Sequence, residues 1–200
     1  MFKGKKDIEA VLMALSEQLD AERAGRIEMV VCGGAALNIM GYVQRTTKDV
    51  DVVAFVERNR DGTAFLAKES PLNPAIMAAA KRVQRDFNLP ENWLNTGPAS
   101  VLDFGLPEGL MKRVETRTYG RSLIIHFLSR YDQIHFKLFA AVDRGRPDVH
   151  FDDLMTLRPT AQETEDAARW TITQDPSDTY KKVLKDFLEK IGYKDVAERI

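Results

Sequence analysis

The 200-residue sequence contains a single cysteine, three histidines and two tryptophans. Because one thiol has no partner within the chain, an internal disulfide is excluded, and Cys32 is expected to pack as a small apolar residue. The sequence also lacks an excess of positive charge, since 29 Lys and Arg residues face 30 Asp and Glu residues. The net charge of −1 therefore does not predict non-specific nucleic-acid binding, although a local basic patch is compatible with it.

Long hydrophobic runs are also missing. No apolar stretch approaches the roughly 20 residues that a membrane-spanning helix requires. Near the N-terminus, Lys3, Lys5 and Lys6 precede a charged amphipathic segment rather than the apolar run of a secretory signal. We therefore expect a cytoplasmic protein without a membrane partner. Hydrophobic residues make up 44% of the chain, which suffices for the core of one domain with a helical appendage.

Hydrophobic periodicity predicts an N-terminal part that mixes helices and strands. Helices are expected over residues 6–22 and 34–40 and from Pro74 onwards, and strands over 26–32, 49–56, 113–119 and 122–128. The last two strands form a hairpin. Residues 89–109 are rich in Pro, Gly and Asn and are predicted to form one long loop, which in a compact domain is often functional.

After Ser129 the pattern becomes helical. Helices are expected over residues 130–143, 150–157, 160–172 and 177–191, with Ser177 as an N-cap and Gly192 as a stop. The predicted fold is α/β (α+β), with a small mixed sheet of four strands flanked by helices. We expect a core domain over residues 1–128 and a helical region over 129–200 that packs on it.

Two glycines followed by two closely spaced carboxylates form the most informative motif. Gly33 and Gly34 come directly after an apolar strand, and Asp49 and Asp51 lie one residue apart on the next strand. Side chains at i and i+2 of a strand point to the same face, so the two carboxylates converge and repel each other unless a cation neutralises them. Mg²⁺ is the usual cation where phosphates are handled.

The flanking residues suit a phosphate group. Glycine lets the backbone approach a ligand closely, and free N–H groups at the start of a helix attract phosphate. Arg45 and Lys48 add positive charge beside the acids. A chance Asp-x-Asp at a solvated strand end is the alternative interpretation, and the glycine pair argues against it.

With these motifs the sequence resembles the nucleotidyltransferase superfamily, which has the fold of DNA polymerase beta. The superfamily pattern is an apolar residue, Gly-Gly or Gly-Ser, a spacer and Asp-x-Asp. Ala35 stands where the superfamily usually has serine. The resemblance implies that the two acids bind two Mg²⁺ ions and that the backbone near Gly33, Gly34 and Ala35, with Arg45 and Lys48, binds a nucleoside triphosphate (NTP).

Later motifs are similar to a bacterial family of nucleotidyltransferases of unassigned function, related to abortive-infection type toxins. They are Trp93-Leu94-Asn95, Leu106-Pro107-Glu108-Gly109, Asp132-Gln133-Ile134-His135-Phe136-Lys137-Leu138 and His150-Phe151-Asp152-Asp153-Leu154. The resemblance implies that Lys137 binds a phosphate and that Asp153 orients it, while Arg144 could assist. Alternatively, the Lys137 side chain could extend to solvent. Asp152 and Asp153 could interact favourably with the dipole at the start of their helix. His150 is a candidate N-cap of that helix.

The superfamily normally has a third carboxylate on a later strand. The strand over 122–128 contains no acid, so the third ligand is missing, replaced by His126, or supplied by Glu115 of the hairpin. A histidine in an apolar strand is more often a hydrogen-bonded structural residue than a metal ligand. Trp93 and Asn95 in the predicted loop could contact a base, or Trp93 could anchor the loop in the core.

Three hypotheses follow. The first is a Mg²⁺-dependent enzyme that transfers NMP from an NTP to an acceptor, which could be a tRNA 3′ end, a protein side chain or a small molecule. As a toxin it would have an antitoxin partner. The second is a catalytically degenerate relative that binds a nucleotide or a partner protein. The third, a structural domain, is disfavoured by the converging carboxylates, which without metal only destabilise the fold.

Overall fold

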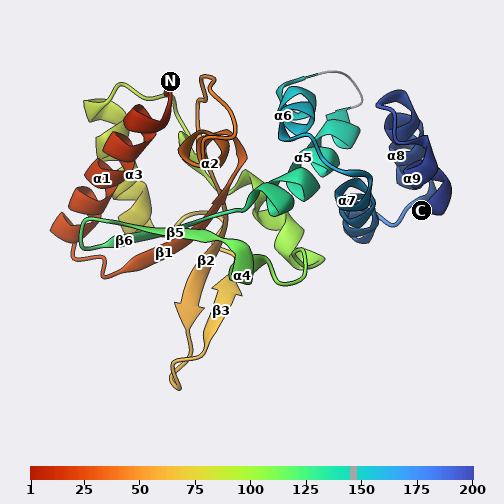
Figure 1. Ribbon diagram of the computed structural model, residues 1–200. Coiled ribbons are helices and arrows are strands. Elements are labelled where there is room, and N and C mark those ends of the chain that lie inside the picture. The colour runs from red at the N-terminus through yellow and green to blue at the C-terminus, as the bar shows by residue number, and fades with distance from the viewer. Residues whose placement is uncertain (145–147) are drawn as a thin grey trace. The chain divides into compact units, whose positions relative to one another are not determined.

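A computed structural model describes residues 1–144 and 148–200 of the chain (Figure 1). The described residues form two compact units. Unit 1 comprises Met1–Asp103 and Met111–Leu128, and unit 2 comprises Phe104–Leu110 and Ser129–Ile200. The expected division into two domains at residue 128 stays a prediction.

Within the described part of the chain, unit 1 contains a six-stranded mixed sheet with the order β3-β2-β1-β6-β5, and β4 pairs with β2 outside this path. The strands are β1 (Ile27–Cys32), β2 (Val50–Arg58), β3 (Ala64–Ala67), β4 (Leu94–Asn95), β5 (Glu115–Tyr119) and β6 (Leu123–Phe127). β1 is antiparallel to β2 and parallel to β6, while β4 is parallel to β2. The predicted α/β class with a mixed sheet is confirmed.

Helices cover one face of this sheet. α1 (Lys5–Ala21) and α3 (Pro74–Asp86) lie side by side, and α2 (Gly33–Ile39) follows β1 (Figure 1). The apolar stripes of α1 and α3 meet alternate strand residues in a core that includes Ile8, Leu12, Leu15, Leu19, Met29, Val31, Val50, Val52, Ile76, Val83, Ile125 and Phe127. Each large buried side chain contributes about 1.5–3 kcal/mol, which fixes the helices on this face.

The sheet is larger than the four strands that the sequence predicted. β3 is a four-residue edge strand, and β4 lies inside the segment 89–109 that was predicted to be one loop. The same segment also contains η1, a 3₁₀ helix over Gly97–Asp103, and α4 (Leu110–Arg113) follows it. Periodicity cannot reveal a two-residue strand, because such a strand is defined by its partner and not by its own pattern.

Unit 2 is helical, as predicted. It contains α5 (Arg130–Arg144), α6 (Val149–Leu157), α7 (Ala161–Gln174), α8 (Asp178–Lys190) and the unpredicted α9 (Lys194–Arg199). Ser177 caps α8 by accepting a hydrogen bond from the Tyr180 N–H at 3.1 Å. The expectation that His150 caps α6 is wrong, because Asp148 accepts hydrogen bonds from the backbone N–H groups of His150 and Phe151. Asp148 offers a carboxylate at the position where exposed N–H groups need an acceptor.

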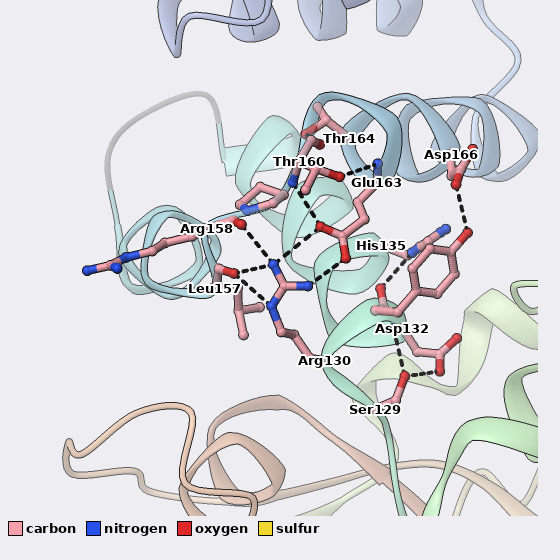
Figure 2. A network of polar contacts seen from close by, with 12 residues as sticks. Ser129, Arg130, Asp132, His135, Leu157, Arg158, Thr160, Glu163, Thr164 and Asp166 are labelled. Carbon is pink, nitrogen blue, oxygen red and sulfur yellow. Dashed lines mark hydrogen bonds and ion pairs between the residues drawn. The ribbon is translucent and has the colours of Figure 1, made fainter.

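One arginine joins three helices of this unit. Figure 2 shows the guanidinium of Arg130 on α5 donating to the carbonyls of Leu157 and Arg158, where α6 ends, and to the carboxylate of Glu163 on α7. Glu163 also accepts from the Thr160 N–H at 2.8 Å and completes the capping box of α7. Arg130 thereby satisfies carbonyls that a helix end otherwise leaves unpaired.

This network predicts a stability that depends on pH. Burial raises the pKa of Glu163, but the hydrogen bonds from Arg130 and Thr160 outweigh it, so the pKa lies below the ordinary 4.5. The stabilisation is therefore complete above about pH 4.5 and is lost as the pH falls through the lowered pKa. Glu163→Gln should reduce the free energy of unfolding at neutral pH by about 1 kcal/mol.

Urea denaturation at neutral pH and at about pH 3.5 measures this effect. The difference between wild type and Glu163→Gln should shrink in acid. Glu189→Gln, an exposed position on α8, is the matched control and should change little at either pH. A difference that is the same at both pH values would show that the charge of Glu163 is not what stabilises the network.

Candidate active site

The backbone of Gly33 meets the carboxylate of Asp51 at the end of β1. Cys32 and Asp51 are paired in the β1–β2 ladder, and α2 begins at the next residue, Gly33, with φ of +72°. A Cβ atom on Gly33 would lie 2.3 Å from Oδ2 of Asp51, which is inside any allowed contact. Only glycine fits, both because φ is positive and because a side chain would displace the carboxylate.

The two carboxylates of the Asp-x-Asp motif are half-buried beside this turn. Asp49 directly precedes β2, and Asp51 is the second residue of that strand. Because Val50 and Val52 lie in the core under α1 and α3, Asp51 points to the opposite face of the sheet. The Oδ1 atom of Asp49 accepts a hydrogen bond from the Thr47 hydroxyl at 3.4 Å. The orientation of Asp51 agrees with the predicted separation of the acids from the apolar face, whereas convergence of Asp49 with Asp51 stays a prediction.

Asn95 holds Asp51 from the other side. It pairs with Asp51 in the β2–β4 ladder, and its Nδ2 atom donates to Oδ1 of Asp51 at 3.1 Å. Its own Oδ1 accepts from the Gly97 N–H at 2.9 Å, which fixes the orientation of the amide. Sequence reasoning treated Asn95 as a possible base contact and missed this role, because the pairing of β4 with β2 has no signal in the sequence.

The second glycine lies against a cationic side chain. A Cβ atom on Gly34 would be 2.6 Å from the Thr47 hydroxyl and 3.0 Å from a guanidinium nitrogen of Arg45. Lys48 is exposed. Ala35 is completely buried in the apolar core, so only its backbone is available to a ligand. The structure thus brings Arg45 to Gly34 and leaves Lys48 exposed, while nucleotide binding by either residue stays a prediction.

The oxygen ligands at Asp49 and Asp51 suit Mg²⁺, which is often bound by one or two carboxylates together with substrate phosphates. Within residues 1–144 and 148–200, however, no group of three or more His, Cys, Asp or Glu side chains is placed to hold a metal. Glu115 cannot be the third ligand. It pairs with Phe127 on the helix-covered face and binds Arg117 there, whereas Asp51 is on the other face.

His126 does share a sheet face with Asp51, but it is engaged elsewhere. It lies beside Val30 in the β1–β6 ladder, while Asp51 lies beside the last residue of β1. Its Nδ1 atom is 2.8 Å from the Thr116 hydroxyl, and its Nε2 atom is 3.4 Å from the Glu28 carboxylate. This is the hydrogen-bonded structural histidine that the sequence left open as the alternative to a metal ligand.

Lys137 and Asp153 form an ion pair inside unit 2. Their charged atoms are 2.8 Å apart, and the side chains are only 4% and 2% exposed. The lysine therefore does not extend to solvent, and the acid does not serve only the helix dipole. The pairing of the two residues agrees with the expected orienting role of Asp153, whereas phosphate binding by Lys137 stays a prediction. The side chain of Arg144 lies outside the described residues.

Trp93 is an anchor and cannot stack on a base. It is 2% exposed, its Nε1 donates to the Ala80 carbonyl at 3.0 Å, and its ring packs edge-on against Phe2. The carbonyl of Trp93 accepts from the Val50 N–H, which leads directly into the Asp51–Asn95 pair. Of the two roles that the sequence left open for Trp93, the structure shows the anchor of the loop.

Comparison with known proteins identifies the family. A family model described as "Nucleotidyltransferase of unknown function (DUF6036)" matches residues 10–158. The chain belongs to this family. The match extends from α1 through the glycine pair and the Asp-x-Asp motif to the Lys137–Asp153 pair. No curated protein and no solved structure matches the sequence. Membership in a nucleotidyltransferase family confirms the predicted enzyme class and implies an NTP substrate.

Among the described helices, none is both long enough and apolar enough to cross a membrane.

The close approach at Gly33 predicts an unusually costly substitution. Gly33→Ala adds a Cβ atom against Asp51 and strains a positive φ, so we expect it to lower the free energy of unfolding by about 3 kcal/mol. Gly41→Ala is the matched control, because φ is +77° there and nothing lies within 4 Å of the added Cβ. It should cost about 1 kcal/mol in urea denaturation. Equal costs would mean that Asp51 moves away without penalty.

The buried ion pair predicts a non-additive mutant cycle. Lys137→Met leaves Asp153 buried without its cation and should destabilise the protein by about 3 kcal/mol. Lys137→Met combined with Asp153→Leu removes both charges and should recover most of that loss. Urea denaturation of wild type, both single variants and the double variant measures the coupling free energy. Additive losses would show that the two charges do not depend on each other.

Proposed function

We propose that this protein is a Mg²⁺-dependent nucleotidyltransferase that transfers NMP from an NTP to an acceptor, with its reaction centre at Asp49 and Asp51. One observation carries the proposal. The chain belongs to a nucleotidyltransferase family. Where β1 ends and β2 begins, the Gly33 backbone approaches the Asp51 carboxylate, and Arg45 lies against Gly34.

Nucleotidyl transfer is an in-line displacement at the α-phosphorus, and its difficulty is the repulsion between an anionic nucleophile and an anionic phosphate. Asp49 and Asp51 would hold the two Mg²⁺ ions, which supply Lewis-acid stabilisation of the attacking and leaving oxygens when bound. Asn95 keeps the Asp51 carboxylate in one orientation through its hydrogen bond, so the ligand does not have to reorganise.

The triphosphate is assigned to the side of Asp51 where the glycines lie. The N–H groups of Gly33, Gly34 and Ala35 would donate to the β- and γ-phosphates, because the missing Cβ of both glycines lets an anion approach. Arg45 contributes positive charge at Gly34, and the exposed side chain of Lys48 adds a second positive charge. Because the side chain of Ala35 has no hydroxyl, its contact with the phosphate would come from the backbone N–H.

For Lys137 and Asp153, which belong to unit 2, the proposal keeps the phosphate-binding and orienting roles that the family resemblance implies. The lysine would bind a phosphate oxygen while Asp153 holds the ammonium in place through the 2.8 Å ion pair. The physical support is the depth of burial, because both charged side chains are almost completely removed from water and such desolvation is costly.

The acceptor is assigned by class only. A tRNA 3′ end, a protein side chain and a small molecule all offer the required hydroxyl, and the toxin-like resemblance favours RNA or protein, with an antitoxin as a partner. A second candidate function is nucleotide binding without transfer. It is favoured by one observation, that no group of three metal-binding side chains occurs among the described residues.

Calorimetric titration of the four NTPs, with and without Mg²⁺, tests the proposed site. Wild type should bind at least one NTP only in the presence of Mg²⁺, and Asp51→Asn should weaken that binding by about 100-fold, because it removes one charged metal ligand. Asp186→Asn, an exposed acid on α8, is the control and should bind like wild type. Equal affinity of Asp51→Asn and wild type would remove Asp51 from the site.

Transfer is measured separately with labelled NTP and a pool of cellular RNA and protein. Incorporation of label that requires Asp51 supports the enzyme. Mg²⁺-dependent NTP binding without any transfer would support the binding-only candidate.

A further inference from the structure

A pocket of about 420 Å³ lies at the β4 edge of the sheet, within unit 1. Its walls are α3, the segment that precedes it and the segment from Asn92 to Thr96. Asn95 belongs both to this pocket and to the site, because its amide donates to Asp51. The pocket therefore begins one side chain away from the proposed metal ligand.

The lining of the pocket is amphipathic. Leu72, Met77 and Ala80 supply apolar surface, and polar groups come from the amides of Gln84 and Asn95 and the hydroxyl of Thr96. Lys81 is the charged residue among the described residues that line it, and none of these lining residues is acidic. A polycationic small molecule would find no counter-charge here.

This chemistry fits a nucleobase. A base has flat apolar faces and an edge of donors and acceptors, and a glutamine amide such as that of Gln84 can match such an edge with two hydrogen bonds. A volume of about 420 Å³ is at the lower end of ligand pockets and is sufficient for one nucleoside. The exposed Lys81 is suited to the phosphate that links the nucleoside to the next one.

The position of the pocket indicates whether the bound base belongs to the NTP or to the acceptor. β2 lies between β1 and β4, so Gly33 and Asn95 are on opposite sides of Asp51. In an in-line displacement the attacking and leaving oxygens lie on opposite sides of the phosphorus. If the leaving phosphates bind at Gly33 and Gly34, the attacking hydroxyl comes from the side of β4, which is the side that lines the pocket.

We propose that this pocket is the acceptor subsite and that it binds the terminal nucleoside of an RNA acceptor, whose hydroxyl is then directed at Asp51. The assignment rests on the proposed function. The acceptor oxygen forms the new bond to the α-phosphorus, pyrophosphate leaves with the bond to the β-phosphate, and the hydroxyl proton passes to solvent or to a carboxylate of the site.

The probe is a set of four dinucleotides, ApA, CpC, GpG and UpU, titrated against the full chain. The readout is the NMR signal of the Trp93 indole N–H, because Trp93 lines the pocket; the other tryptophan signal is assigned with Trp170→Phe. At least one dinucleotide should shift the Trp93 signal in a saturable way. The double variant Gln84→Ala and Thr96→Val should weaken that binding by about tenfold or more, since two hydrogen-bonding groups are lost.

Arg85→Ala is the matched control, because Arg85 is on α3 next to Gln84 and does not line the pocket. It should leave dinucleotide binding unchanged. Calorimetric titration of the same variants with NTP in the presence of Mg²⁺ measures their NTP affinity. The acceptor assignment requires that the double variant keeps the NTP affinity of wild type.

Three results would overturn the assignment, and they differ from one another. If the double variant weakens NTP binding as much as dinucleotide binding, the pocket holds the base of the NTP. If wild type binds NTP with Mg²⁺ but no dinucleotide shifts Trp93, the pocket is not a nucleobase site and the proposed function stands. If dinucleotides bind but no NTP does, the proposed function fails and the acceptor assignment with it, while nucleobase binding is supported.

Discussion

The contact between the Gly33 backbone and the Asp51 carboxylate is the constraint on which the candidate site depends. It requires that β1 ends at Cys32, that α2 begins with a positive φ and that Cys32 is in register with Asp51. A shift of one residue in that register would turn Asp51 into the apolar core. The many buried side chains under α1 and α3 make such a shift costly, so the core holds the site in place although it does not contact a ligand.

The two faces of the sheet have separate roles, and this separation explains which polar residues can serve the site. The face under α1 and α3 is closed by packing, and Glu115 lies on that side with Arg117 as its partner. The opposite face carries Asp51 and His126, but His126 is bonded to Thr116 and Glu28. On that face Asn95 donates a hydrogen bond to Asp51 and thereby limits the orientations of its carboxylate.

Arg130 and Lys137, two cationic side chains of unit 2, differ in burial and in the partners that the structure gives them, because the Arg130 side chain is 33% exposed and the Lys137 side chain is 4% exposed. Arg130 donates to two helix-end carbonyls and to Glu163, so its charge is satisfied many times over and it organises α5, α6 and α7 (Figure 2). Lys137 pairs with the carboxylate of Asp153 at 2.8 Å and is almost completely buried. Arg130 thus has an evident structural task. Burial of the Lys137–Asp153 pair is costly in desolvation, and a role of the pair in the reaction stays a prediction.

The sequence by itself determined the main helices and four of the strands, the mixed α/β class and the separation of Asp51 from the apolar face, because each follows from local periodicity and turn residues. It also located the glycine pair and the candidates Arg45, Lys137 and Asp153. Only the tertiary structure decided that β4 exists, that Asn95 binds Asp51, that Glu115 is on the wrong face and that Trp93 is an anchor. These features depend on strand pairing between distant segments, and a pairing of two residues leaves no periodic trace in the chain.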